Sequence, residues 1–240
     1  MVRSSEDART EIRQGIDEVQ SRIDSAASRS GRSGDDITLV AVSKTVDRDV
    51  VDIAYELGLR EFGENRVQDA IGKFADDVPD DLILHMIGPV QSNKARQCVG
   101  RFALIHSVDR KSLIDELAKR ARAAGIVQRV LLQINVAREP QKHGCDPDDV
   151  ARLLERVLMK ESLSPIGFMM MAPLVEDPEQ ARPHFAEMQR IADRVRTAYP
   201  DVDLPELSMG MTNDFEVAIE EGATIVRVGR AIFHPSDVSE

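Results

Sequence analysis

The stretch TLVAVSKTVDR, residues 38–48, contains a short apolar run that ends next to a lysine. The run at residues 39–42 has the length and the β-branched side chains of a buried strand. The charged residues from Asp47 onward open an amphipathic segment with the pattern of a helix. The stretch therefore predicts one strand followed by one helix, with Lys44 at the junction between them.

The same strand-and-helix pattern recurs along the whole chain. After a first helix over residues 5–29, we predict strands at residues 37–43, 59–62, 82–87, 102–107, 128–136, 164–170, 204–208 and 223–228. Segments with helical periodicity lie between them, and such alternation is typical of a parallel sheet. Eight units favour an α/β fold of the single-domain TIM-type (β/α)8 barrel class. An open doubly wound sheet is the alternative.

Length and composition describe one globular domain, with 240 residues of which 42% are hydrophobic and 30% charged. We assign residues 1–240 to it, with flexible tails at about residues 1–5 and 235–240. The formal net charge of −11 argues against a nucleic-acid surface, which needs lysine and arginine to neutralise phosphates. The sequence has neither an apolar leader segment nor a run of about 18 apolar residues, so we expect no membrane contact and a cytoplasmic location. Cys98 and Cys145 are expected to be free thiols.

In a barrel of this class the functional residues gather at the carboxyl ends of the strands. Lys44 lies at such an end. A lysine facing the barrel mouth is partly desolvated, which lowers its pKa and frees the amine to form a Schiff base with an aldehyde. The alternative is a lysine that reaches solvent or pairs with a neighbouring acid.

The loops after the last two predicted strands read SMGMTND and VRVGRA. Barrels of this class commonly bind phosphate with these two loops and a helix N-terminus. Ser208 offers a hydroxyl, Gly210 and Gly229 allow close approach of the backbone, and Asp214 begins or caps a helix. Ordinary turn chemistry would also explain these residues.

Arg227 lies inside the apolar run TIVRVG, so the alternation of the strand points it into the barrel. A buried arginine needs an acceptor, and a structural ion pair with an acid on a strand is the simple explanation. Combined with Lys44 and a phosphate site, however, Arg227 suggests an aldehyde that carries a phosphate. Pyridoxal 5'-phosphate (PLP) has both groups, and a sugar-phosphate aldehyde in a Schiff-base aldolase is the competing candidate.

A longer set of motifs makes the assignment specific. AVSKT, FGENRVQDA, HMIGPVQSNKAR, QINVAREPQKHG, GFMMMAP, LSMGMTNDFEVAIEEGATIVRVG and AIF follow one another over residues 39–233. In this order they resemble the motifs of the pyridoxal phosphate homeostasis family, also called the proline synthase co-transcribed bacterial homologue. The segment from LSMGM to VRVG is long and unusual, so the resemblance is strong.

The resemblance implies a barrel like the N-terminal domain of alanine racemase, with PLP held as a Schiff base on Lys44. By the same resemblance, Ser208 and the backbone amides of Gly229 and Arg230 hold the phosphate. Asn65 lies beside the cofactor, and Arg227 approaches the pyridine nitrogen. Lys142 matches a further lysine of the family, whose role we leave open.

The sequence departs from the family pattern at a few positions. Pro89 and Val90 stand where histidine and leucine are usual, and Arg230 replaces a common threonine, so a side-chain hydroxyl to the phosphate is lost unless its guanidinium substitutes for it. His234 stands where glycine is usual, and Met170 replaces a threonine. None of these changes affects Lys44, Ser208 or Arg227.

The family resemblance implies a cofactor carrier with no turnover. A charged arginine beside the ring nitrogen disfavours its protonation and restrains carbanion chemistry. A racemase also needs an acid or base opposite the lysine. In alanine racemases a tyrosine of a second domain fills this role. Of the two tyrosines of this chain, Tyr55 lies in the helix predicted after the first strand and Tyr199 lies far from any strand end. A racemase-like PLP enzyme, a Schiff-base aldolase and a protein-interaction module are the alternatives.

The remaining features add little to this interpretation. The five histidines form no HxH or HExxH pair, so we expect no metal site. We interpret His85 and His106 as core residues. Met169, Met170 and Met171 fill the core, although one of them could touch the ring. The expected partners are PLP and, transiently, PLP-dependent apoenzymes, and we expect a monomer.

Overall fold

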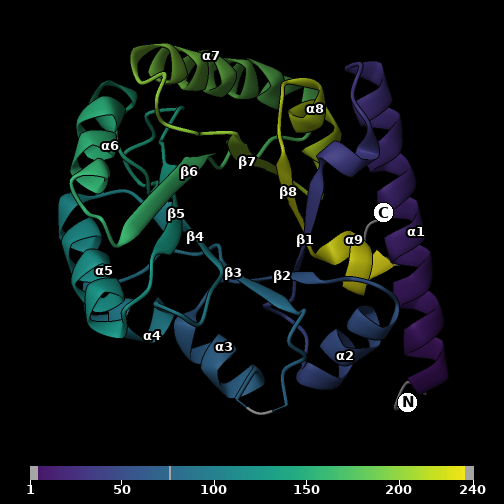
Figure 1. Ribbon diagram of the computed structural model, residues 1–240. Coiled ribbons are helices and arrows are strands. Elements are labelled where there is room, and N and C mark those ends of the chain that lie inside the picture. Colours follow the sequence, from purple (N-terminus) through teal and green to yellow (C-terminus); the bar gives the residue numbers. More distant parts are fainter. Residues whose placement is uncertain (1–4, 76, 236–240) are drawn as a thin grey trace.

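Eight parallel strands close into a barrel in the computed structural model, which describes residues 5–75 and 77–235 (Figure 1). Each strand pairs with the next along the chain, and the last pairs with the first. The strands are β1 (Thr38–Val42), β2 (Glu61–Glu64), β3 (Ile83–Met86), β4 (Leu104–Val108), β5 (Gln128–Gln133), β6 (Leu163–Met169), β7 (Glu206–Met211) and β8 (Ile225–Val228). The prediction of a single-domain TIM-type barrel is confirmed, and the open-sheet alternative is wrong.

Helices surround the ring of strands (Figure 1). They are α1 (Ser5–Arg29), α2 (Arg48–Glu56), α3 (Val67–Lys73), α4 (Ala95–Cys98), α5 (Lys111–Ala124), α6 (Val150–Leu158), α7 (Arg182–Ala198), α8 (Phe215–Glu220) and α9 (Arg230–Phe233). Short 3-10 helices also form at η1 (Gly34–Asp36), η2 (Ser92–Lys94), η3 (Pro147–Asp149) and η4 (Pro178–Ala181).

The first helix, α1, has the bounds that its sequence predicts. Acidic residues lie in its first turn and Arg29 in its last, which matches the polarity of the helix dipole. One face of α1 buries Ile12, Val19 and Ile23 and contacts α8 and α9. Figure 1 shows α1 along the outside of the barrel beside these helices. The helix therefore covers the part of the barrel where the last strand meets the first.

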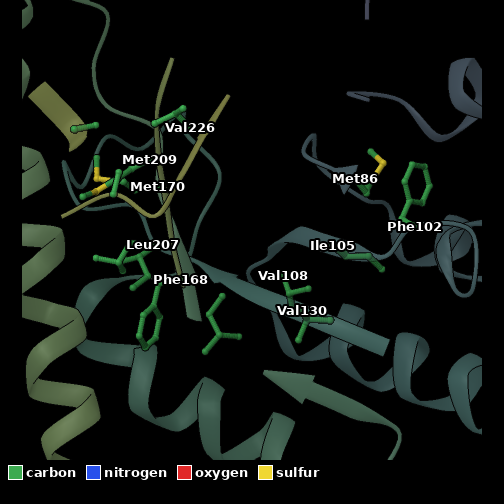
Figure 2. Packing of buried hydrophobic residues seen from close by; sticks show 14 of the residues in the cluster. Met86, Phe102, Ile105, Val108, Val130, Phe168, Met170, Leu207, Met209 and Val226 are labelled. Carbon is green, nitrogen blue, oxygen red and sulfur yellow. The ribbon is translucent and has the colours of Figure 1, made fainter. Parts of the chain in front are cut away.

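Apolar side chains form two separate cores because successive residues of a strand point to opposite faces. The larger core lies between the strands and the helices, and Figure 2 shows part of it, including Ile105, Val130 and Phe168. The smaller core fills the inside of the barrel and consists of Val40, Leu104, Leu131, Met169 and Ile225. Leu104 and Ile105 are neighbours on β4 and belong to different cores, so the alternation can be followed residue by residue.

The seventh strand ends three residues later than predicted, at Met211 and not at Ser208. Gly210 has a φ of 92°, a left-handed value that glycine adopts at little cost. The MGM sequence resembles a loop, but this glycine lets the strand continue through an irregular register against β8. Ser208 therefore lies within the strand, below the mouth of the barrel.

Three further predictions concern the whole chain. No helix in the described part of the chain is long and apolar enough to cross a membrane. Cys98 and Cys145 are free, as predicted. Both are buried, and burial raises the pKa of each thiol to about 12. Of the predicted flexible tails, residues 1–4 and 236–240 lie outside the described residues.

Candidate functional site

A cavity of about 330 Å3 opens at the carboxyl ends of the strands. Five of the six predicted site residues line it, namely Lys44, Asn65, Arg227, Gly229 and Arg230. The other side chains and backbone segments of its wall come from Val42, Thr45, Ile87, Met171, Met211, Thr212 and His234. The fold thus brings residues that are more than 180 positions apart in the sequence to one cavity.

Lys44 occupies a turn immediately after β1. The turn is closed by a 3.1 Å hydrogen bond from the Val46 amide to the Ser43 carbonyl. The Lys44 residue is exposed, so protein atoms alone do not desolvate its amine strongly. Lys44 thus lines the cavity while remaining exposed, and its role as the amine of a Schiff base stays a prediction.

The backbone beside Lys44 is held by a buried ion pair. Glu64 is fully buried, and one of its oxygens accepts hydrogen bonds from the Ser43 hydroxyl and from Lys73 Nζ, each at 2.7 Å. Lys73 Nζ also donates to the Ser43 carbonyl at 2.6 Å. We call Ser43, Glu64 and Lys73 the Glu64 clamp. It ties the ends of β1 and β2 to α3, outside the barrel ring.

Asn65 follows β2 directly and owes its position to a glycine in the next loop. A Cβ atom at Gly88 would lie 2.1 Å from the carbonyl oxygen of Asn65. Only glycine lets the loop after β3 approach Asn65 this closely. The Gly88 carbonyl is held in turn by the Ser107 hydroxyl at 2.6 Å.

Arg227 points into the barrel, as its place in β8 predicts, and is almost completely buried. Its guanidinium donates to the Ser208 hydroxyl at 2.7 Å and to the Met170 carbonyl at 2.9 Å. Burial lowers the pKa of Arg227 to about 10, and the negative charge of Asp214 opposes this shift. Among the described residues no carboxylate forms a salt bridge with Arg227, so the ion pair that would explain it most simply is not observed.

Ser208 is the predicted site residue that the structure places elsewhere. Its hydroxyl lies inside the barrel, between Arg227 Nη1 and His106 Nδ1, the latter at 2.9 Å. Because β7 continues to Met211, the hydroxyl that reaches the cavity from this region belongs to Thr212. The predicted strand boundary placed Ser208 at the mouth, but in the structure Thr212 of the same SMGMTND loop lines the cavity.

The loops after β7 and β8 are joined to each other across the rim of the cavity. Arg230 donates to the Asn213 side chain at 3.1 Å, so the guanidinium that replaces the usual threonine bridges the two loops. Asp214 accepts from the Met211 amide at 2.7 Å, and burial raises the pKa of its carboxyl group. These contacts fix the backbone on both sides of Thr212.

Several other predicted roles can be compared with the structure. Met169 and Met170 are buried, while Met171 is 46% exposed and lines the cavity. Tyr55 and Tyr199 lie outside the cavity wall, where their hydroxyls bind Asp81 at 2.5 Å and Glu155 at 2.8 Å. The Lys142 amine contacts Glu139 at 2.6 Å and the Ala172 carbonyl at 3.2 Å, and it does not line the cavity.

The fold and a family model agree on the class of protein. The model described as alanine racemase, N-terminal domain, matches residues 16–237, so the chain has this barrel over nearly its whole length. Clostridium difficile alanine racemase shares the fold with a TM-score of 0.74 at 12% identity. That likeness covers 93% of this chain and 56% of the racemase.

Closer relatives define the family. The pyridoxal phosphate homeostasis protein of Aquifex aeolicus is 43% identical over 91% of this chain and 95% of that protein. The protein of the same name from Pseudomonas aeruginosa is 40% identical over 94% and 96% of the two chains. This chain belongs to the pyridoxal phosphate homeostasis protein family.

A solved structure of a similar protein contains the cofactor of the family name. PipY of Synechococcus elongatus with PLP bound is 35% identical and has a TM-score of 0.82. The alignment covers 92% of this chain and 99% of PipY.

Proposed function

We propose that this chain binds PLP reversibly through Lys44 and carries or buffers it. In this way it maintains intracellular PLP homeostasis and affects amino-acid metabolism indirectly. The observation that carries the proposal is the meeting of Lys44, Arg227, Gly229 and Arg230 at one cavity at the barrel mouth. The shared name of the relatives and the PLP-bound structure of PipY support the same conclusion.

The cavity suits a ligand that carries both an aldehyde and a phosphate. Its volume of about 330 Å3 falls within the range of about 300–1,000 Å3 that is typical of small-molecule sites. Its wall contains one lysine, two arginines and two threonines, namely Lys44, Arg227, Arg230, Thr45 and Thr212. We assign the hydroxyl contact with the phosphate to Thr212 in place of Ser208. The backbone amides of Gly229 and Arg230 complete the phosphate site, and Asn65 lies beside the ring.

When bound, PLP supplies an aldehyde that reacts reversibly with amines. Lys44 Nζ forms the carbon–nitrogen double bond, and one water leaves. Release follows when the amine of an acceptor adds to the same carbon and the Lys44 amine departs. Because Lys44 is exposed, the amine of an acceptor has steric access to the carbon that Lys44 holds.

Arg227 favours storage of the cofactor over catalysis. With PLP bound, its positive charge would lie beside the ring nitrogen and would disfavour a proton there, which would restrain carbanion chemistry. The cavity wall within the described residues contains no tyrosine that could act as a second base. We therefore propose a carrier without turnover that acts as a monomer in the cytoplasm. It delivers PLP transiently to apoenzymes.

The decisive experiment is a visible absorption spectrum of the purified protein before and after borohydride reduction, followed by mass mapping. We expect a yellow band that reduction fixes onto Lys44, and loss of this band in Lys44→Ala. Lys119→Ala is the matched control, because Lys119 is an exposed lysine of α5 outside the cavity. A protein that stays colourless after addition of PLP would contradict the proposal and favour the sugar-phosphate aldolase.

A racemase-like activity is tested separately. Exchange of the α-proton of an amino acid, measured by deuterium incorporation, should be absent from the PLP-loaded protein. Exchange that is present in the wild type and lost in Lys44→Ala would instead identify an enzyme.

A further inference from the structure

A continuous line of hydrogen bonds crosses the inside of the barrel, starting at Arg227. Arg227 Nη1 donates to the Ser208 hydroxyl at 2.7 Å, and this hydroxyl lies 2.9 Å from His106 Nδ1. His106 Nε2 lies 2.9 Å from His85 Nδ1, and His85 Nε2 contacts the Glu61 carboxylate. We call these five residues the interior relay.

The relay connects the cavity with the opposite end of the barrel. Its members come from five strands, β8, β7, β4, β3 and β2. Arg227 lines the cavity at the carboxyl ends, while Glu61 is the first residue of β2 and keeps 27% of its side chain exposed. Ser208 and His106 are fully buried. The relay is therefore a polar line through the inner apolar core.

With both imidazoles neutral, the chemistry of the two ends fixes the direction of every bond. An arginine only donates and a carboxylate only accepts, so the Ser208 hydroxyl accepts at one end and His85 Nε2–H donates at the other. Each neutral imidazole has one donor and one acceptor, which leaves His85 Nδ1 to accept from His106 Nε2–H. His106 Nδ1 then accepts the single proton of Ser208, and every group is satisfied.

The opposite direction leaves a defect. If His106 Nδ1 carried the proton, Ser208 would accept from both neighbours, and its own proton would have no partner among the described residues. His85 Nε2 would then present a lone pair to the Glu61 carboxylate. A cationic His106 is also disfavoured, because burial lowers its pKa well below the usual value and the nearby Arg227 guanidinium acts in the same direction.

We propose that Glu61, His85 and His106 are positioning residues for the cofactor site. They touch nothing in the cavity, but through Ser208 they hold the guanidinium of Arg227 in one orientation toward the ring. The part of this inference that concerns the ring rests on the proposed function. The bond directions and the two histidine tautomers do not depend on it.

Glu61→Gln tests the relay with little change in volume. The glutamine amide both donates and accepts, so the line loses its fixed direction and His85 and His106 are free to exchange tautomers. The matched control is Glu206→Gln. Glu206 is the first residue of β7, and its side chain accepts a hydrogen bond from Thr224, but it makes no contact with the relay.

The first measurement is 15N NMR of the histidine side chains in the full-length protein, with the signals assigned through His85→Gln and His106→Gln. We expect both imidazoles to be neutral with the proton on Nε2 at pH 7, in the wild type and in the control. Glu61→Gln should give a mixture of tautomers. An Nδ1–H form or a positive charge on either ring in the wild type would overturn the proposed directions, whatever the protein binds.

The second measurement is the rate at which PLP-loaded protein releases its cofactor to an excess of a free amine. Loss of one ordered hydrogen bond to a charged group predicts release roughly tenfold faster in Glu61→Gln. Ser208→Ala, which removes the link between Arg227 and the histidines, should act in the same direction. Release at the wild-type rate in both variants would overturn the positioning role. Failure of the protein to bind PLP at all would contradict the proposed function while the NMR result still decides the relay.

Discussion

The Glu64 clamp and the interior relay each contain a positively and a negatively charged side chain, but the two charges are in direct contact in the clamp and far apart in the relay. In the clamp, the Lys73 ammonium lies 2.7 Å from a Glu64 oxygen, in the layer between strands and helices. In the relay, the side chains of three residues separate the Arg227 guanidinium from the Glu61 carboxylate. Breaking the clamp leaves one unpaired buried charge, whereas breaking the relay leaves unsatisfied hydrogen-bonding groups. Breaking the clamp should therefore lower the free energy of unfolding more, whereas breaking the relay should mainly affect the cofactor site.

The largest effect should come from Lys73→Met. This change leaves the Glu64 carboxylate buried without a cation and should lower the free energy of unfolding by about 3–5 kcal/mol. The measurement is urea denaturation, with exposed Lys119→Met as control. The double variant Lys73→Met/Glu64→Leu should recover most of the loss, because an apolar pair replaces the ion pair. A cost below about 1 kcal/mol for the single change would mean that the clamp is not a tight ion pair in solution.

Ser208→Ala should have the next largest effect, of about 2 kcal/mol. Arg227 loses the hydroxyl that accepts its hydrogen bond, and His106 loses its hydroxyl partner, while both side chains are buried. The comparison is Ser43→Ala in the clamp, for which we expect about 1 kcal/mol, since Glu64 keeps Lys73 as a partner. Chemical denaturation of the two variants side by side distinguishes them. Equal losses of unfolding free energy in the two variants would mean that Ser208 in the relay and Ser43 in the clamp stabilise the protein to the same extent.

His106 should make stability depend on pH. Its folded-state pKa lies well below that of the unfolded chain, about 6.5, so the unfolded state binds more protons as the pH falls. Stability is therefore lost below about pH 6.5, by at most about 1.4 kcal/mol per pH unit. His106→Gln should flatten this slope between pH 6.5 and 5.5, whatever its absolute stability. An unchanged slope would show that His106 accepts a proton in the folded protein.

The smallest effect should come from Glu206→Gln, at less than about 0.5 kcal/mol. Its amide oxygen can still accept from the Thr224 hydroxyl, and the side chain is only partly buried. Thermal unfolding of this variant next to Glu61→Gln sharpens the comparison between two glutamates that each begin a strand. A loss as large as that of Glu61→Gln would mean that the position in the strand, and not the relay, determines the effect.

The sequence was sufficient for the barrel and for most of the cavity wall, because both follow from local patterns. Alternating strand and helix signals predict the ring, and the carboxyl end of each strand is then known within a few residues. This precision was enough to predict that Lys44, Asn65 and Gly229 lie together at one end of the barrel. It failed at β7, where a left-handed Gly210 let the strand continue, so that Thr212 and not Ser208 reached the cavity.

The relay could not be predicted in the same way. His106 and Ser208 are 102 residues apart, and they meet only because the strands β4 and β7 face each other across the barrel interior. Sequence patterns indicate that a side chain points inward, as for His85 and His106, but not which inward side chain lies opposite. Glu64 poses the same difficulty, since its place beside Asn65 in the chain gave no sign of full burial against Lys73.

The turn that presents Lys44 also has an entropic consequence. Every polar atom of Ser43 is already engaged: its amide donates to Gly63 at 3.1 Å, its hydroxyl donates to Glu64, and its carbonyl accepts from Val46 and Lys73. The main chain leading to Lys44 is thus ordered before any ligand arrives. Binding then has to immobilise only the lysine side chain, which costs up to about 2 kcal/mol of rotamer entropy. A mobile side chain on a rigid main chain can be attached and released many times without refolding the loop that carries it.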